Sequence, residues 1–448
     1  MKGRKIITAV LIALAAMTAM DQKAYASETD AIEGLIAQYQ RETKCGRVSV
    51  VVYENGVTTC YGDSASLYQI GSMTKAFTGL AVQKLMNGGA VREDGTVSEY
   101  IPGFCAYYDS EQVEITVRDL LEQKSGYTNN EKDYPSGTDA MTLSGWTDSI
   151  SGRELKCRPG TEYAYSNVNY NLLGSIIEHV TGRSYREYME QEILIPLGLS
   201  HTSVGLPADG SIVEGTRLSY RHAADFPLAV REASIPAGYF YSDTEDMGRW
   251  IDIWTGSTVI PEDLAEPLSA VKARLVNEGD YYSGWELFAD GVTGHSGGTP
   301  NYSSRVVFSE DRQIGVCVLS NLNVAATTDS LCNSIYDTVA GRTPGGLTAD
   351  IWTVFDLIFT GISAAGILLF AAAFLIRKKV PLIVLDAFLA VLLVLVFILF
   401  PVIFGAGMKE ILFTWAPWSM TGGLLIIAAD IVLLSVRLFR PAGDGSAT

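Results

Sequence analysis

The chain has 448 residues, of which 48% are apolar and 19% are charged, and its formal net charge is −17 at pH 7. Its length and apolar content exclude an intrinsically disordered chain and are enough for more than one domain. The negative charge excludes a general affinity for nucleic-acid phosphates, so no nucleic-acid partner is expected.

The acidic residues are concentrated in the middle of the chain. Residues 1–26 carry a net charge of +3, residues 27–350 carry −21, and residues 351–448 carry +1. A block this acidic is repelled by anionic lipid headgroups. Any attachment of residues 27–350 to a membrane therefore has to be made by apolar segments.

Residues 1–26 have the pattern of a secretory signal peptide. A basic start is followed by an apolar run over residues 6–20 and by Ala24-Tyr25-Ala26, which is a small-x-small cleavage site. The pattern predicts export and cleavage before Ser27. An uncleaved anchor helix is the alternative, although an apolar run of 15 residues is short for a membrane span.

The acidic block has strands near both of its ends. Apolar residues at helical spacing predict a helix over residues 27–43, and residues 48–61 predict a β-hairpin with its turn at Asn55-Gly56. A second hairpin is predicted over residues 305–319 and a helix over residues 327–339. Most of the sequence between the hairpins is predicted as helix and loop. This pattern predicts an α+β fold in which one antiparallel sheet is assembled from both ends of the block.

Ser72 stands at the start of a predicted helix that ends at Gly88-Gly89, and Lys75 follows three residues later. On a helix this spacing lets the lysine amine reach the serine hydroxyl, and the positive end of the helix favours an alkoxide-like nucleophile. Many helices contain Ser-x-x-Lys by chance. The alternative is therefore a helix-capping serine with a solvated lysine.

Two further motifs carry groups suited to acyl transfer. In the polar aromatic loop at residues 163–170, Tyr165 can relay a proton between Ser72 and a leaving group. Asn167 either holds a substrate amide carbonyl and Lys75 together or caps the next helix. In the glycine-rich segment at residues 294–301, the amide of Gly298 is expected to form an oxyanion hole with the amide of Ser72.

These motifs resemble the serine β-lactamase and penicillin-binding-protein superfamily, in its class C-like branch. The resemblance covers about residues 32–339. It extends to Tyr68-Gln69-Ile70, Ile115-Thr116-Val117-Arg118-Asp119-Leu120-Leu121, Ser125-Gly126, Pro196-Leu197-Gly198-Leu199, Ala237-Gly238-Tyr239, Asp246-Met247 and Leu319-Ser320-Asn321. It implies the β-lactamase/DD-peptidase fold, an antiparallel sheet flanked by helices with a helical subdomain. It also implies that Ser72 is acylated, that Lys75 and Tyr165 share the role of base, and that water releases the acyl group.

The third motif departs from the superfamily in a way that bears on substrate. Many members have lysine where this chain has His295, which carries only partial charge at its ordinary pKa of about 6.5. Recognition of a substrate carboxylate is therefore expected to be weaker, unless Arg305 replaces the charge. Gln123-Lys124 is a second departure, with no consequence that the sequence reveals. The expected substrate-binding residues are Asn167, His295, Ser296, Gly297 and Asn301.

The chain has six cysteines and four histidines, and all six cysteines lie in the acidic block. An even number of cysteines in an exported domain permits disulfides, and Cys45 with Cys60 and Cys317 with Cys332 are the nearest pairings in the sequence. Neither a Cys-x-x-Cys nor a His-x-His motif is present. No metal or other cofactor is expected.

Residues 351–376, 380–405 and 411–436 are almost continuously apolar and are each long enough to cross a bilayer. They predict an all-α membrane domain, joined to the globular domain (residues 27–340) by a linker over residues 341–350. Basic residues at 377–379, 437 and 440 belong on the cytoplasmic side by the positive-inside rule, with the tail at 441–448. Trp352, Trp415 and Trp418 lie near the outer ends of the spans. Asp356, Asp386 and Asp430 are candidates for a relay or transport role, or are acids that reach headgroup water near the span ends.

Together these features predict a membrane-anchored, extracytoplasmic bacterial serine hydrolase that forms an acyl-enzyme on a peptide or amide substrate. An exported domain followed by three spans resembles the membrane-bound peptidases that remove an N-acyl-D-amino-acid motif from peptide prodrugs. The expected activity is a peptidase on D-amino-acid-containing peptides, either peptidoglycan stem peptides or such precursors. A β-lactamase or small-ester hydrolase is the first alternative, and a non-catalytic module that binds or senses the cell wall is the second.

Overall fold

The two ends of the acidic block meet in one seven-stranded sheet with the strand order β11-β12-β13-β14-β15-β1-β2. β1 (Val48–Glu54) lies antiparallel to β15 (Ile314–Ser320), with Val51 opposite Cys317. The other strands are β2 (Val57–Tyr61), β11 (Tyr281–Tyr282), β12 (Trp285–Leu287), β13 (Thr293–Thr299) and β14 (Tyr302–Ser309). The expected α+β fold, with a sheet assembled from both ends, is confirmed. The computed structural model describes residues 28–130, 133–135, 137–208, 210–279, 281–376 and 378–439, so the predicted signal peptide and cytoplasmic tail lie outside the described residues.

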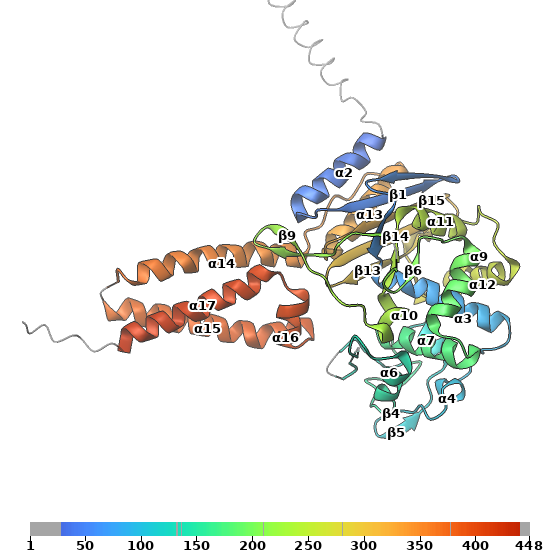
Figure 1. Cartoon of the computed structure of the whole chain (residues 1–448), viewed down its shortest axis with the longest axis horizontal. Coiled ribbons are helices and arrows are strands. Elements are labelled where there is room, and N and C mark those ends of the chain that lie inside the picture. The colour runs from blue at the N-terminus through green and yellow to red at the C-terminus, as the bar shows by residue number, and fades with distance from the viewer. Residues whose placement is uncertain are drawn as a thin grey trace, which may run out of the picture.

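The sheet is covered by helices on both faces (Figure 1). Alternate residues of β1 face opposite ways, as the pleat requires. Val50 and Val52 pack in a cluster with α2 (Glu28–Thr43) and α13 (Ala325–Val339), whereas Val51 and Tyr53 belong to the larger core on the other face. A strand buried on both faces has to be apolar throughout, and the valine-rich run of β1 meets that requirement.

The helical middle of the domain packs on the larger core. Its longer helices are α3 (Thr74–Asn87), α6 (Leu143–Ile150), α7 (Asn167–Thr181), α11 (Thr244–Thr255) and α12 (Glu262–Glu278). The short helices are η1 (Gly71–Met73), α4 (Val97–Tyr100), α5 (Val117–Leu121), α8 (Tyr185–Met189), η2 (Glu190–Leu194), α9 (Ile195–Leu197), η3 (Glu232–Ser234), α10 (Ile235–Gly238) and η4 (Ala289–Gly291). The short strands are β3 (Ser66–Gln69), β4 (Ala106–Tyr108), β5 (Glu111–Val113), β6 (Ser203–Val204), β7 (Ser211–Ile212), β8 (Thr216–Ser219), β9 (His222–Asp225) and β10 (Phe240–Ser242).

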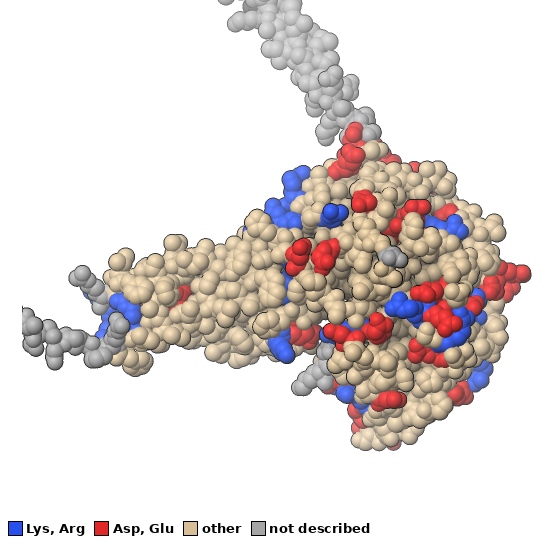
Figure 2. All heavy atoms as spheres, in the orientation of Figure 1, with Lys and Arg blue, Asp and Glu red and all other residues tan. Residues whose placement is uncertain are grey.

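Three long helices project from the domain as a bundle (Figure 1). They are α14 (Ile351–Ala373), α15 (Lys379–Phe404) and α17 (Trp418–Phe439), and each is long and apolar enough to cross a membrane. The sides of the bundle are almost free of charged atoms (Figure 2). Asp386, on α15, accepts a hydrogen bond from the Ser435 hydroxyl of α17 at 3.2 Å.

The third long helix begins at Trp418, so the expected start at residue 411 is wrong. Residues 408–415 instead form two short turns, α16 (Met408–Glu410) and η5 (Ile411–Trp415). Pro417 explains the break, because a proline holds the preceding residue in extended conformation, and Ala416 has φ −74° and ψ 153°. We call residues 408–415 the connector.

All six cysteines are free thiols, so the disulfides expected from sequence proximity are absent. The Cys45 thiol lies beside the Ser320 hydroxyl at 3.2 Å, whereas Cys60 is exposed on β2. Cys317 and Cys332 are both buried, and the Cys332 thiol donates to main-chain carbonyls. Closeness in sequence did not bring either pair into bonding geometry.

β13 packs closely against Ile70, just before η1, because residue 297 is a glycine. A Cβ atom at Gly297 would collide with the carbonyl of Ile70 and the hydroxyl of Ser304, whereas a Cβ atom at Gly298 would meet nothing within 4 Å. We expect Gly297→Ala to reduce the free energy of unfolding by about 1–3 kcal/mol through overpacking. The melting temperature of the full chain in detergent should then fall by about 3–10 °C.

The neighbouring Gly298→Ala variant is the matched control, since it adds the same methyl group to the same strand in open space. Its melting temperature should stay close to that of the unchanged protein, as measured by tryptophan fluorescence. Equal melting temperatures for the two variants would contradict the close approach of β13 to η1.

Candidate active site

Ser72 lies in the single turn η1 that leads into α3, and Lys75 lies in the first turn of α3. The Lys75 Nζ donates hydrogen bonds to the Ser72 Oγ at 2.9 Å, to the Asn167 Oδ1 at 2.8 Å and to the main-chain carbonyl of Ala237 at 2.6 Å. Three segments that are far apart in sequence therefore fix one amine beside one hydroxyl. Sequence reasoning missed Ala237 as a partner, because a carbonyl acceptor has no side-chain signature.

The Lys75 side chain is completely buried. Within the described part of the chain, no carboxylate forms an ion pair with it. Burial without a compensating charge lowers its pKa well below the usual value for lysine. Burial therefore favours the neutral amine, which would keep two N–H groups for Asn167 and Ala237 and present a lone pair that can accept the proton of the Ser72 hydroxyl.

Tyr165 lies over the same amine, with its ring centre 4.9 Å from the Lys75 Nζ. Burial raises the pKa of the phenol above its usual value, and its interaction with the Ser72 hydroxyl acts in the opposite direction. The phenol therefore keeps its proton near neutral pH. Beside Ser72 the site places one group able to accept a proton and one able to donate a proton.

Gln123 holds the loop that carries Tyr165 and Asn167. Its side-chain oxygen accepts a hydrogen bond from the amide of Ser166 at 2.9 Å and a second from the Asn169 side chain. The carbonyl of Gln123 accepts the amide of Ala164 at 2.8 Å. The departure from the superfamily at Gln123 thus has a structural role in positioning this loop, which only the tertiary contacts reveal.

The structure brings Gly298 to the nucleophile. A Cβ atom at Gly71 would lie 2.5 Å from the Gly298 nitrogen, so β13 and η1 are in direct contact. Ser72 and Gly298 both line the same cleft, in which an oxyanion could lie between their amides.

His295 is buried and carries no charge. Its Nδ1 lies 2.6 Å from the carbonyl of Ser296, so this nitrogen holds the proton and the Nε2 presents a lone pair. Burial, reinforced by the nearby Lys75, lowers the pKa of His295 to about 3. The partial positive charge expected from the sequence is therefore wrong. The ring packs 6.1 Å from that of Tyr165 and 5.9 Å from that of Tyr281, a residue that sequence reasoning missed.

Ser296 and Arg305 face away from the cleft. The Ser296 hydroxyl donates to Asp329 at 2.9 Å and accepts from the Arg305 guanidinium at 2.7 Å. Arg305 is also 3.7 Å from the Asp329 carboxylate. Neither residue is placed to bind substrate, and the charge of Arg305 is already paired. This arrangement corrects the expectations that Ser296 binds substrate and that Arg305 replaces the missing lysine charge.

A cleft of about 710 Å³ opens over the nucleophile. Five of the predicted catalytic, oxyanion-hole and substrate-binding residues line it, namely Ser72, Tyr165, Asn167, Gly298 and Asn301. His295 and Gly297 lie behind this lining, and Gly297 serves the contact of β13 with η1. The cleft has a further wall made by Lys409, Glu410, Phe413, Thr414 and Trp415 of the connector.

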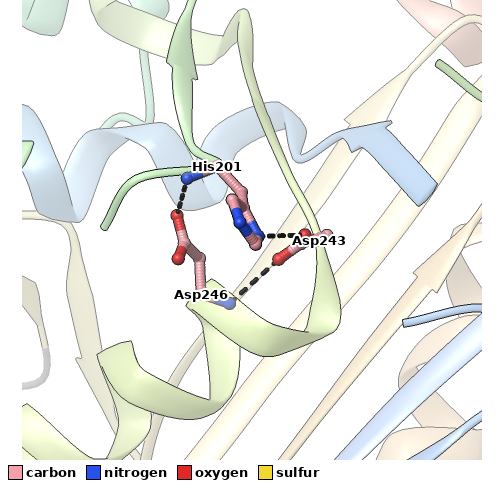
Figure 3. Close-up of side chains that lie close together, drawn as sticks. All are labelled: His201, Asp243 and Asp246. Carbon is pink, nitrogen blue, oxygen red and sulfur yellow. Dashed lines mark hydrogen bonds and ion pairs between the residues drawn. The ribbon is translucent and has the colours of Figure 1, made fainter. Parts of the chain in front are cut away.

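A second cluster of titratable groups lies elsewhere, where His201, Asp243 and Asp246 have ligand atoms within 4.8 Å of one another (Figure 3). The Asp246 carboxylate accepts the amides of His201 and Thr202 at 2.8 and 2.7 Å. Asp243 caps α11 by accepting the amide of Asp246 at 2.9 Å, and it also accepts the His201 Nδ1 at 2.8 Å. These carboxylates are used by the protein itself, and they fix the start of α11.

The region of the chain that matches known proteins includes Ser72, Lys75, Tyr165 and Gly298. A family model described as Beta-lactamase matches residues 32–335. Protein flp of Staphylococcus aureus (strain MRSA252) is 32% identical over 265 residues, which are 57% of this chain and 53% of that protein. An Escherichia coli (strain K12) protein named "Putative D-alanyl-D-alanine carboxypeptidase" is 38% identical over 148 residues, 31% of this chain and 34% of that protein. The chain thus spans about half the length, or less, of these relatives.

Solved structures show the same fold at low sequence identity. The octameric penicillin-binding protein homologue from Pyrococcus abyssi has a TM-score of 0.61 at 22% identity, covering 74% of this chain and 81% of that chain. A class C beta-lactamase has a TM-score of 0.60 at 17% identity, covering 71% of this chain and 98% of that chain. The globular domain therefore shares the fold of these proteins.

Proposed function

Since the chain belongs to the beta-lactamase family, we propose that it is a membrane-anchored peptidase that forms an acyl-enzyme on D-amino-acid-containing peptides. It is a serine hydrolase of the superfamily that contains β-lactamases and penicillin-binding proteins. The observation that carries the proposal is the fully buried Lys75 amine, 2.9 Å from the Ser72 hydroxyl and without an acidic partner among the described residues.

The proposed reaction begins with attack of the Ser72 Oγ on the scissile carbonyl carbon. The Lys75 amine accepts the hydroxyl proton, and the amides of Ser72 and Gly298 donate hydrogen bonds to the oxyanion. Collapse of the intermediate breaks the C–N bond, and the leaving amine takes the proton of the Tyr165 phenol. Lys75 returns its proton to Tyr165. In the second half of the reaction a water molecule attacks the ester carbonyl carbon, and its proton passes to the neutral Lys75 amine, directly or through Tyr165. The ester C–O bond then breaks, and Lys75 returns the proton to the Ser72 Oγ, which releases the carboxylic acid.

One observation supports a peptide substrate. The relative from Escherichia coli is named as a carboxypeptidase for D-alanyl-D-alanine, although it matches only 31% of this chain. Peptidoglycan stem peptides and N-acyl-D-amino-acid precursors are the two candidate substrate groups.

The proposed location of the globular domain is outside the cytoplasm. Figure 2 shows basic atoms at the end of the bundle that lies away from the domain. Basic residues lie at the two helix ends on this side of the bundle. They are Lys378 and Lys379 at the start of α15 and Arg437 near the end of α17. Under the positive-inside rule this end faces the cytoplasm, which places the domain and its cleft on the other side.

The test uses the full chain in lipid nanodiscs and mass spectrometry. A muropeptide ending in D-Ala-D-Ala, an N-acyl-D-asparaginyl peptide and nitrocefin are incubated separately with the protein. We expect hydrolysis of at least one D-peptide, no hydrolysis of its L-isomer, and a transient mass increase on the Ser72 peptide. Turnover of nitrocefin alone would show the peptidase proposal to be wrong. If neither hydrolysis nor labelling by a fluorophosphonate occurred, a wall-binding module would be favoured.

A further inference from the structure

We propose that the connector is part of the substrate-binding site and that Lys409 binds a carboxylate group of the substrate. The inference rests on the proposed function, which it deepens by naming a feature of the substrate. Figure 1 shows α16 at the end of the bundle that adjoins the globular domain. Five connector residues, from Lys409 to Trp415, line the same cleft as Ser72 and Tyr165.

Arg217 of β8 fixes the connector to the domain. Its side chain is 2% exposed, and its guanidinium donates to the main-chain carbonyls of Leu412 at 2.6 Å, Phe413 at 3.1 Å and Ala416. The guanidinium also lies 4.2 Å from the ring centre of Trp418. Charge-assisted hydrogen bonds in a buried setting are strong and directional, so the connector has a defined place over the cleft.

Asp356 fixes the same hairpin, β8–β9, to the membrane helices. This carboxylate of α14 is fully buried and accepts hydrogen bonds from the amide of Arg221 at 2.8 Å and from the Ser419 hydroxyl of α17 at 2.7 Å. A Cβ atom at Gly422 of α17 would collide with the Tyr220 hydroxyl, so the hairpin tip packs directly on the helix. Asp356 thus fixes the hairpin to the membrane helices.

The other end of the hairpin is fixed to the third motif. The amide of Thr216 donates to the carbonyl of Asn301 at 3.2 Å, and the Asn301 side chain donates to the carbonyl of Phe226 at 2.9 Å. Asn301 itself lines the cleft. One hairpin therefore connects the membrane helices, the connector and the wall of the candidate active site, which makes the connector a fixed wall of the cleft.

Lys409 supplies the charge that the third motif lacks. It lines the cleft and is exposed, and no ion pair in the described part of the chain involves it. Arg231, which also lines the cleft, lies 3.8 Å from Asp139, and Arg305, which faces away from the cleft, lies 3.7 Å from Asp329. The adjacent Glu410 accepts a hydrogen bond from the Trp415 indole at 3.3 Å. A carboxylate on a peptide bound above Ser72 would therefore find its cation on the membrane side.

The test compares one D-peptide substrate with a free C-terminal carboxylate against the same peptide as its C-terminal amide. With the full chain in nanodiscs, Lys409→Ala should raise KM for the acid about 3- to 10-fold and leave KM for the amide unchanged. Lys409→Arg should restore the lower KM. Lys378→Ala removes the same charge at the opposite end of the bundle and should change neither value. Equal KM values for Lys409→Ala and the unchanged protein on the acid would overturn the role of Lys409.

The connector wall has a separate test in Phe413, whose side chain is 54% exposed and lines the cleft. Phe413→Ala should raise KM for both peptides about 3- to 10-fold through lost apolar contact. Labelling of Ser72 by a small fluorophosphonate should keep its rate in both connector variants. If Phe413→Ala had unchanged KM values for both peptides and normal labelling, the connector would not be part of the substrate-binding site, and the proposed function would stand. If the unchanged protein were not labelled, the proposed function itself would be refuted.

Discussion

The Ser72→Ala variant is expected to form no covalent adduct and to hydrolyse the D-peptide substrate about 10⁴- to 10⁶-fold more slowly than the unchanged protein. In the proposed reaction, the Ser72 Oγ is the atom that forms the bond to the substrate. The substitution removes only this atom, and Ser72 lies at the floor of an open cleft, so no cavity forms inside the core. The melting temperature should therefore change little while the activity is lost.

Intact-protein mass spectrometry after incubation with a fluorophosphonate gives the clearest measurement of this effect. Ser269→Ala is the control, because Ser269 is an exposed serine in α12 whose hydroxyl donates to the carbonyl of Ala265. This variant should be labelled like the unchanged protein. A full mass increase on Ser72→Ala would mean that another residue is the nucleophile, and the proposed mechanism would have to be abandoned.

The neighbours of Ser72 could be predicted only where they follow a local rule. Lys75 is predictable, since a spacing of three residues on a helix places two side chains on one side. The antiparallel sheet is likewise visible in two hairpins at the two ends of the domain. Ala237 and Gln123 could not be predicted, because their contributions are a carbonyl group and a loop contact that arise only when distant segments meet.

The charge of His295 illustrates a second limit of sequence reasoning. The identity of the residue suggests partial protonation, but its burial near Lys75 determines that it is neutral. The connector was also hidden, because apolar residues continue from 411 to 436 and hydropathy merges them into one span. Pro417 was the available signal, since a proline inside an apolar run often marks the end of one helix and the start of another. Asp356 had no local signal, since its partners lie on β8–β9 and α17.

Lys75→Met is expected to reduce the rate of acylation of Ser72 about 10²- to 10⁴-fold, which is the usual contribution of a positioned general base. Methionine retains most of the buried volume of lysine but has no group that can accept the Ser72 proton. The carbonyl of Ala237 and the Asn167 side chain each lose a donor, so the melting temperature has to be measured in parallel. Stopped-flow or quenched labelling with the fluorophosphonate gives the acylation rate directly.

The pH dependence separates Lys75 from His295 as the titrating group. Acylation requires the neutral amine, and burial lowers the pKa of Lys75, so kcat/KM should fall as the pH drops through that lowered pKa. His295, with its pKa lowered to about 3, stays neutral across this range. In His295→Gln, kcat/KM should therefore still fall on the acid side at the same pH, even if its maximum is lower. In Lys75→Met this acid limb of the pH profile should be absent. A limb that disappears in His295→Gln and persists in Lys75→Met would identify the histidine as the base.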